Sequence, residues 1–193
     1  MTPENDEFNP DDFVSACDLE AAPAGQAGSG PAAAAAPAGQ AADRAPSRFL
    51  TFQPPFSWDA VARQPYKVEG AGFAGVDRHV LFGPGDSTAF HVRYFELAPG
   101  GYSSLEKHRH AHAVICARGC GLAVVGTEVR PMNPMDAVYV SPMTPHQFIN
   151  ESEEPFGFFC IVDADRDRPQ PVSREELAAL RANPAVARAI RLK

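Results

Sequence analysis

The most constraining feature of this sequence is a series of short apolar runs that begins near Phe49 and continues almost to the C-terminus. The runs are rich in Val, Ile, Phe and Tyr, and Gly, Pro or Asp interrupts them every eight to twelve residues or so. This spacing is typical of antiparallel strands in a sandwich or barrel. No internal repeat is present, so we expect an all-β fold with one barrel. The runs cover residues 78–82, 89–97, 113–116, 122–125, 137–140 and 156–162.

The N-terminal part of the chain has a different composition. Residues 1–20 contain seven acidic and no basic residues, and 21–47 are dominated by Ala, Pro and Gly. Interleaved Pro and Gly prevent helix formation, so we predict a disordered tail over 1–47 that could bind a protein partner. The tail accounts for the net charge of −7. The rest of the chain is close to neutral, which argues against a nucleic acid partner.

The C-terminal part of the chain has helical features. Ser173 and Glu176 have the spacing of a capping box, and Leu177 and Leu180 follow at helical spacing. Pro184 should end this helix, and a second short helix is expected over 185–190. We therefore divide the chain into the tail 1–47, a β-barrel over 48–170 and a helical extension over 171–193.

The expected location of the protein follows from what the chain lacks. No run approaches the roughly 20 apolar residues of a membrane span, and the N-terminus does not resemble a secretory signal. The four cysteines form no C-x-x-C pair, so we expect free thiols in a reducing compartment. These features predict a cytoplasmic protein with no membrane partner.

A cluster of histidines is the strongest candidate for a functional site. Glu106, His108, His110 and His112 alternate along one segment, and His146 lies in a later one. Alternate residues of a regular strand share a face but lie about 6.6 Å apart, so one strand rarely supplies four ligands to one ion. We expect two or three ligands from this segment, helped by a bend between His108 and His112, and one from elsewhere.

The alternative to metal binding is a solvated polar strip. Several imidazoles inside a barrel would each need a polar partner, which a metal ion would supply. The sequence therefore predicts one divalent transition metal ion, with Fe(II) preferred and Mn, Ni and Zn also suitable. His79 and His91 belong to no such cluster and are expected to be structural.

Two segments resemble the conserved motifs of the cupin superfamily. Counting from Gly100 to Gly119, the first motif places ligand positions at Glu106, His108 and His112, with Glu and His exchanged relative to the usual pattern. In another alignment, His108 and His110 form the His-x-His pair. Whether Glu106 or His110 completes the site stays open.

The second cupin motif resembles residues 136–150. Asp136 opens it, Pro142 and Pro145 precede the ligand position at His146, and Asn150 closes it. The glycine that is usual in this motif is replaced. The resemblance implies a small single-domain, metal-binding cupin with an antiparallel jelly-roll barrel, and a homodimer.

The resemblance implies several functions. The first is a metal-dependent enzyme acting on a small organic substrate, most consistent with oxygen-dependent, dioxygenase-like chemistry, or with isomerase, lyase or hydrolase chemistry. Glu106, if it does not bind the metal, is the candidate general base. The alternatives are a non-catalytic metal or ligand sensor, and an accessory subunit docked through the N-terminal tail.

Aromatic residues are expected around this site. The predicted pocket wall comprises Tyr94, Phe95, Phe148, Phe156 and Phe158, although the strand register over 90–97 is not determined by the sequence. Residues 49–66, with Phe52, Phe56 and Trp58, are expected to cover the barrel or a neighbouring subunit.

Overall fold

The computed structural model describes residues 45–67 and 72–192. The prediction of a disordered tail over 1–47 therefore falls outside the described residues, apart from 45–47. In the described part, thirteen strands are followed by two helices. The strands are β1 (Phe52–Gln53), β2 (Ser57–Trp58), β3 (Arg63–Pro65), β4 (Ala74–Phe82), β5 (Phe90–Tyr102), β6 (Glu106–Lys107), β7 (His112–Arg118), β8 (Gly121–Val125), β9 (Glu128–Met132), β10 (Ala137–Val140), β11 (His146–Ile149), β12 (Phe156–Asp163) and β13 (Gln170–Pro171).

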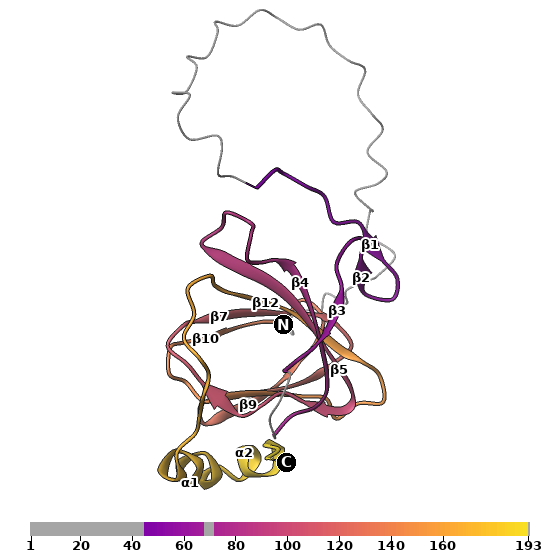
Figure 1. The fold of residues 1–193 in the computed structure, drawn as a ribbon. Coiled ribbons are helices and arrows are strands. Elements are labelled where there is room, and N and C mark those ends of the chain that lie inside the picture. Colours follow the sequence, from indigo (N-terminus) through magenta and orange to yellow (C-terminus); the bar gives the residue numbers. More distant parts are fainter. Residues whose placement is uncertain (1–44, 68–71, 193) are drawn as a thin grey trace, which may run out of the picture. The chain divides into compact units, whose positions relative to one another are not determined.

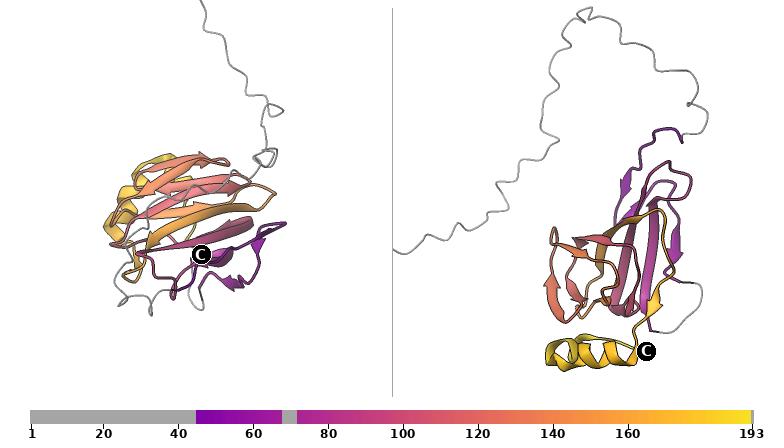
Figure 2. Two further views of the ribbon diagram at one scale, coloured as in Figure 1. Left: turned by 90° about the horizontal axis from the view of Figure 1, so that it is seen from above. Right: turned by 90° about the vertical axis from the view of Figure 1, so that its left-hand side faces the viewer.

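The strands form the predicted antiparallel barrel, which is nearly closed (Figure 1). One side of the barrel has the strand order β10, β7, β12, β5, β4 and β3, and the other is built from β9, β8, β11, β6 and β13. Strand β5 belongs to both sides, because its first part pairs with β4 and β12 while Tyr102 pairs with Ile149 of β11. Figure 2 shows the stacked strands from two further directions.

Strand β5 bends from one side of the barrel to the other at Gly100 and Gly101, at the start of the first motif. Gly100 has a φ of +73°, which L side chains rarely adopt. A Cβ on Gly101 would lie 2.8 Å from the carbonyl oxygen of Ala98. The buried Asn150 amide, from the end of the second motif, donates hydrogen bonds to the Leu97 and Ala98 carbonyls at 2.9 and 3.1 Å. The two motifs therefore hold the same bend.

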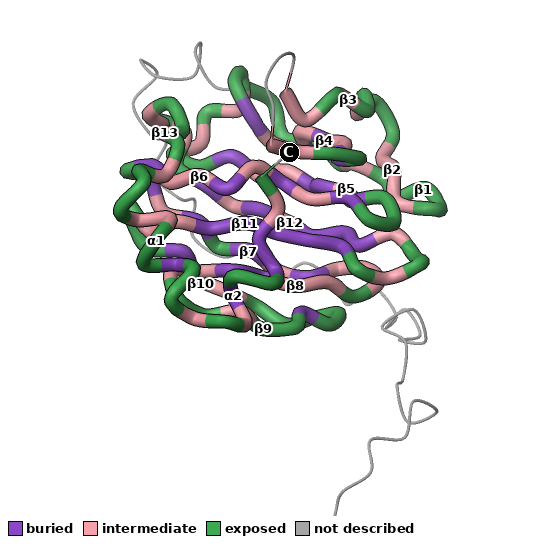
Figure 3. The backbone as a smooth tube through the Cα atoms, turned by 90° about the horizontal axis from the view of Figure 1, so that it is seen from below, coloured by how far each residue is buried: buried purple, intermediate pink, exposed green. Residues whose placement is uncertain are grey.

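Apolar side chains form one cluster inside the barrel and a second between the barrel and the C-terminal helices. The main core is formed by the inward faces of β5, β7 and β12, which are buried in Figure 3, and it includes Phe95, Leu97 and Phe158. Helices α1 (Arg174–Ala182) and α2 (Pro184–Ala189) cover the outer face of the β8–β9 side. Leu180 and Val186 are buried there in a second cluster. This burial fixes the helices to the barrel.

The two helices expected in the C-terminal part are present, the second over Pro184–Ala189 instead of 185–190. Ser173 and Glu176 form the capping box at the start of α1. Pro184 begins α2 rather than merely interrupting α1, because the missing N–H of proline costs nothing in the first turn of a helix. In the described part of the chain, no helix is long and apolar enough to cross a membrane.

The segment before β4 covers the outside of the barrel. The rings of Phe56 and Trp58 lie 5.4 and 5.2 Å from the ring of Tyr94, measured between centroids. Tyr94 is completely buried as a result. Of the three aromatic residues predicted to cover the barrel, Phe52 packs on Phe56 and Trp58 but stays half exposed.

The two end glycines of the first motif allow a test of the fold. Gly119 has a φ of +63°, and a Cβ there would lie 2.2 Å from the carbonyl oxygen of Pro155. Gly100 has a similar φ, but a Cβ there would meet no atom within 4 Å. We expect Gly100→Ala to lower the free energy of unfolding by about 1–2 kcal/mol, the usual cost of left-handed backbone.

Gly119→Ala should lower the free energy of unfolding clearly more than Gly100→Ala does, because it adds a steric clash to the same backbone penalty. Urea denaturation of both variants beside the parent protein measures the difference. Equal losses would show that the contact with Pro155 is not tight.

Candidate metal centre

A bend in the chain brings two of the predicted ligands together. No strand runs between β6 and β7, so the segment from His108 to Ala111 turns instead of continuing straight. The Asp167 carboxylate accepts hydrogen bonds from the Arg109 N–H at 2.9 and 3.0 Å and from the His110 N–H at 3.3 Å. These bonds hold the pKa of Asp167 well below its usual range. The bend expected between His108 and His112 is therefore held by Asp167, a residue of a distant loop.

Three imidazoles converge beside this bend. His108 precedes the bend, His112 begins β7, and His146 begins β11 on the opposite side of the barrel. One nitrogen from each ring lies within 4.8 Å of the others, and all three side chains are buried. The ring centroids of His108 and His112 lie 4.3 Å apart, and that of His146 lies 4.9 and 5.0 Å from them.

The hydrogen bonds of these rings determine which nitrogen is free. His108 Nδ1 lies 2.8 Å from the His110 carbonyl oxygen, and His146 Nδ1 lies 2.9 Å from the Thr144 carbonyl oxygen. A carbonyl only accepts, so both Nδ1 atoms carry the proton and both Nε2 atoms keep a lone pair. His112 Nδ1 contacts the Cys160 Sγ at 3.4 Å.

The free nitrogens are what a metal ion would require. The Nε2 atoms of His108 and His112 are buried and have no hydrogen-bond partner. Burial, the largest cause for all three residues, lowers their pKa values, that of His146 to about 4. The rings are therefore neutral near pH 7, and each is oriented through Nδ1, as histidine ligands commonly are. The residues fit a transition metal ion.

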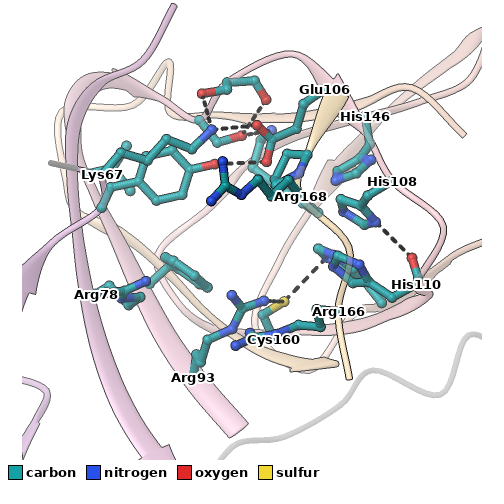
Figure 4. A pocket seen from close by; sticks show the side chains of 18 of the residues that line it. Lys67, Arg78, Arg93, Glu106, His108, His110, His146, Cys160, Arg166 and Arg168 are labelled. Carbon is teal, nitrogen blue, oxygen red and sulfur yellow. Dashed lines mark hydrogen bonds and ion pairs between the residues drawn. The ribbon is translucent and has the colours of Figure 1, made fainter. Parts of the chain in front are cut away.

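Neither of the two candidates for a fourth ligand, Glu106 and His110, belongs to the three-histidine group. The Glu106 carboxylate forms an ion pair with Lys67 and lies outside the three-histidine group (Figure 4). His110 stacks on His108 but directs its Nδ1 to Asp167 Oδ1 at 2.8 Å. A second potential ligand group comprises His108, His110 and Asp167. Its Asp167 carboxylate already accepts three N–H bonds, so the three-histidine group is the better candidate.

The histidines lie in a pocket inside the barrel. Of the five aromatic residues predicted for its wall, Phe95, Phe148 and Phe158 do line it. The prediction is wrong for Tyr94 and Phe156. Tyr94 points to the outside of the barrel, beneath Trp58, because strand alternation places Arg93 and Phe95 inward. Phe156 belongs to the main core.

Several polar residues line the pocket that the sequence did not predict. Arg93 Nη2 donates to Cys160 Sγ at 3.3 Å, so this thiol lies between an arginine and His112 (Figure 4). Burial raises the pKa of the Cys160 thiol. The alternation of β4, β5 and β12 could have identified Arg78, Arg93 and Cys160 once the register was known, whereas Lys67 and residues 166–168 lie outside these strands. Arg93 is expected to face the pocket in one of the two registers left open for 90–97, and the missed residues are Lys67, Arg78, Cys160, Arg166, Asp167 and Arg168.

The buried neutral histidines predict a pH-dependent stability. In the unfolded chain His146 titrates near pH 6.5, whereas the folded pKa is about 4, so the unfolded state binds more protons between these values. Stability of the metal-free protein should therefore fall as pH decreases from 6.5. By pH 5, the protonation of His146 in the unfolded state alone should lower the free energy of unfolding by on the order of 2 kcal/mol, at 1.36 kcal/mol for each pH unit.

Urea denaturation of the chelator-treated protein between pH 7 and pH 5 measures this loss. We expect His146→Gln to make the fall in stability with decreasing pH less steep, because glutamine does not titrate, while His108 and His112 still contribute. An equally steep curve for the variant would contradict the assignment of a buried, neutral His146.

Comparisons with known proteins agree with this fold. The cupin domain model matches residues 93–162. The chain is 44% identical, over 140 residues, to a 1-methylthio-D-xylulose 5-phosphate methylsulfurylase of Rhodospirillum rubrum, with 72% of this chain and 89% of that protein aligned.

Two solved structures are similar over the same part of the chain. A cupin-2 domain from Rhodospirillum rubrum is 44% identical with a TM-score of 0.65, covering 72% of this chain and 93% of the other. A cupin 2 conserved barrel domain protein from Rhodopseudomonas palustris is 42% identical with a TM-score of 0.69, covering 75% and 99%. Together with the barrel and its two motifs, these matches show that the chain belongs to the cupin superfamily and contains a cupin-2 domain.

Proposed function

We propose that this protein is a metal-dependent enzyme that removes the methylsulfanyl group from a small ketose phosphate. The observation that carries the proposal is a pocket in which three imidazoles with free nitrogens lie beside the thiol of Cys160. The relative at 44% identity, named as a methylsulfurylase of 1-methylthio-D-xylulose 5-phosphate, supports the choice of substrate.

His108, His112 and His146 would hold the metal ion in this proposal. A bound divalent ion supplies Lewis-acid polarisation of a substrate carbonyl, here the ketone next to the carbon that carries sulfur. The preference for Fe(II), with Mn, Ni and Zn as alternatives, stays a prediction. All three imidazoles are neutral ligands, so the ion would keep its full positive charge for the substrate.

Cys160 is the proposed acceptor of the methylsulfanyl group. Its sulfur attacks the substrate sulfur, so that a Cys160–S–S–CH₃ disulfide forms while the bond between sulfur and C1 breaks. The electron pair of that bond passes to C1, where the adjacent carbonyl delocalises it, and C1 then takes up a proton equivalent to the one lost by the thiol. Cys160 is thereby oxidised and C1 is reduced to a methyl group.

A second thiol completes the cycle. A small external thiol attacks the disulfide, leaves with the methylsulfanyl group and returns Cys160 to its reduced form by thiol–disulfide exchange. Glu106, the predicted general base, lines the same pocket with Lys67 and is proposed to carry the proton to C1. Arg93 and His112 position the thiol through their contacts with Sγ.

The other functions expected from the sequence stay predictions. Oxygen-dependent chemistry would appear as substrate-dependent oxygen uptake, which the proposed reaction does not need. A sensor or accessory subunit would retain metal without turnover. The homodimer and a partner for the N-terminal tail are also proposals, which gel filtration and pull-down with and without residues 1–47 would examine.

The metal ligands can be tested by metal content. We expect His146→Ala to reduce metal affinity by more than roughly 100-fold, since even residues that only support ligands contribute 10–100-fold. The measurement is elemental analysis after separate loading with iron, manganese, nickel or zinc and removal of free metal. His91→Ala is the matched control, because His91 is also buried but lies outside both potential ligand groups. Equal metal content in the two variants would show that the ligands are misassigned.

The role of Cys160 can be tested separately from metal binding. Cys160→Ser should abolish methylsulfanyl transfer while metal content stays unchanged, because the serine hydroxyl cannot form the disulfide. In the parent protein, mass spectrometry of digested samples taken before the external thiol is added should find the methylsulfanyl group on Cys160. Cys116→Ser and Cys120→Ser are the controls, since neither residue lines the pocket. Full activity of Cys160→Ser would exclude the covalent step.

A further inference from the structure

Three half-buried arginines line the pocket without an acidic partner. Arg78 comes from β4, Arg93 from β5, and Arg166 from the loop that follows β12. Within the described part of the chain, no carboxylate forms an ion pair with any of them, although other arginines such as Arg130 do have one. Figure 4 shows the three side chains gathered along one side of the pocket, with His146 and His108 on another.

The three guanidinium groups are close enough to repel one another. Desolvation by burial is the largest cause of the lowered pKa of Arg166, and the charges of Arg93 and Arg78 lower it further. Burial and the charge of Arg93 likewise lower the pKa of Arg78. Like charges gathered in a partly desolvated wall destabilise the empty protein, and an anion bound between them would remove that cost.

Some hydrogen-bond donors of Arg78 and Arg93 have no partner. The Nε atoms of Arg78 and Arg93 are buried and make no hydrogen bond. Their other contacts are to neutral groups: Arg78 Nη2 donates to the Gln64 amide oxygen at 2.9 Å, and Arg93 Nη2 donates to Cys160 Sγ at 3.3 Å. Guanidinium groups bind phosphate oxygens through paired N–H donors, so this wall matches a tetrahedral dianion better than a single carboxylate.

We propose that Arg78, Arg93 and Arg166 bind the phosphate group of a phosphate monoester substrate whose other end reaches the three histidines. This assignment deepens the proposed function and rests on it for the identity of the substrate, whereas the anion site itself rests on the arginines alone.

Cys160 lies between the arginines and the histidines, so one substrate could contact both groups. Its sulfur lies 3.3 Å from Arg93 Nη2 and 3.4 Å from His112 Nδ1, so the thiol separates the arginine wall from the histidines. A phosphate held by the unused donors of Arg93 and by its two neighbours would leave the thiol free. The carbon chain of a small sugar phosphate would then extend from the arginines past Cys160 to the histidines.

The test uses inorganic phosphate and the full-length, metal-free protein. Isothermal titration at a pH above the second pKa of phosphate should detect binding to the parent protein. We expect Arg78→Gln and Arg166→Gln each to weaken that binding by roughly tenfold or more, the loss expected for a charge-assisted hydrogen-bonding group. Arg130→Gln is the control, because Arg130 is exposed and pairs with Glu128. Metal retention equal to that of the parent shows that the variants are folded.

Several results would overturn the assignment. One is a parent protein that binds no phosphate; another is equal binding by Arg78→Gln and Arg130→Gln. Kinetics with 1-methylthio-xylulose, with and without its phosphate, separate this inference from the proposed function. Phosphate binding lost in the arginine variants, in a protein with no methylsulfanyl transfer, would support the anion site and reject the proposed reaction. Transfer that is equally fast without the phosphate would reject the assignment of the substrate phosphate to the arginines and leave the reaction standing.

Discussion

The candidate site depends on one interaction, the hydrogen bonding of the Asp167 carboxylate to the bend between β6 and β7. Its oxygens accept the N–H groups of Arg109 and His110 and contact the His110 ring. Without that bend, His108 and His112 would lie in one extended strand, too far apart to offer nitrogens to a single ion. His110 therefore supports the site: its ring stacks on those of His108 and His112, with centroids 3.6 and 5.3 Å away, while its Nδ1 contacts Asp167.

Much of the fold and of the histidine group could be predicted from the sequence. The spacing of apolar runs predicts the antiparallel barrel because each strand buries one face and ends at a turn residue. His108 and His112 could be selected because Gly100 and Gly119 fix the count along the first motif, and His146 because it holds the ligand position of the second. The structure brings these three rings together. The capping box at Ser173 was equally local, and its contacts are those expected.

The remaining parts of the site depend on contacts between distant segments, which one sequence does not specify. The register of β5 determines whether Arg93 or Tyr94 faces the pocket. The packing of Trp58 on Tyr94 favours the register in which Tyr94 faces outward. The sequence predicts only a free thiol at Cys160, since its neighbours Arg93 and His112 come from two other strands. The choice between Glu106 and His110 also depends on a contact between distant segments, because the ion pair of Glu106 with Lys67 determines where the Glu106 carboxylate lies.

The loop between β12 and β13 has a consequence for how this protein can evolve. Arg166, which lines the pocket, is directly followed by Asp167, which holds the histidine bend. Surface loops usually accept insertions and deletions between homologues because little depends on their exact path. Here a single added residue between β12 and Asp167 would move the carboxylate away from Arg109 and shift the pocket arginine with it. Natural variants of this barrel should therefore keep the length of this short loop while its exposed side chains vary freely.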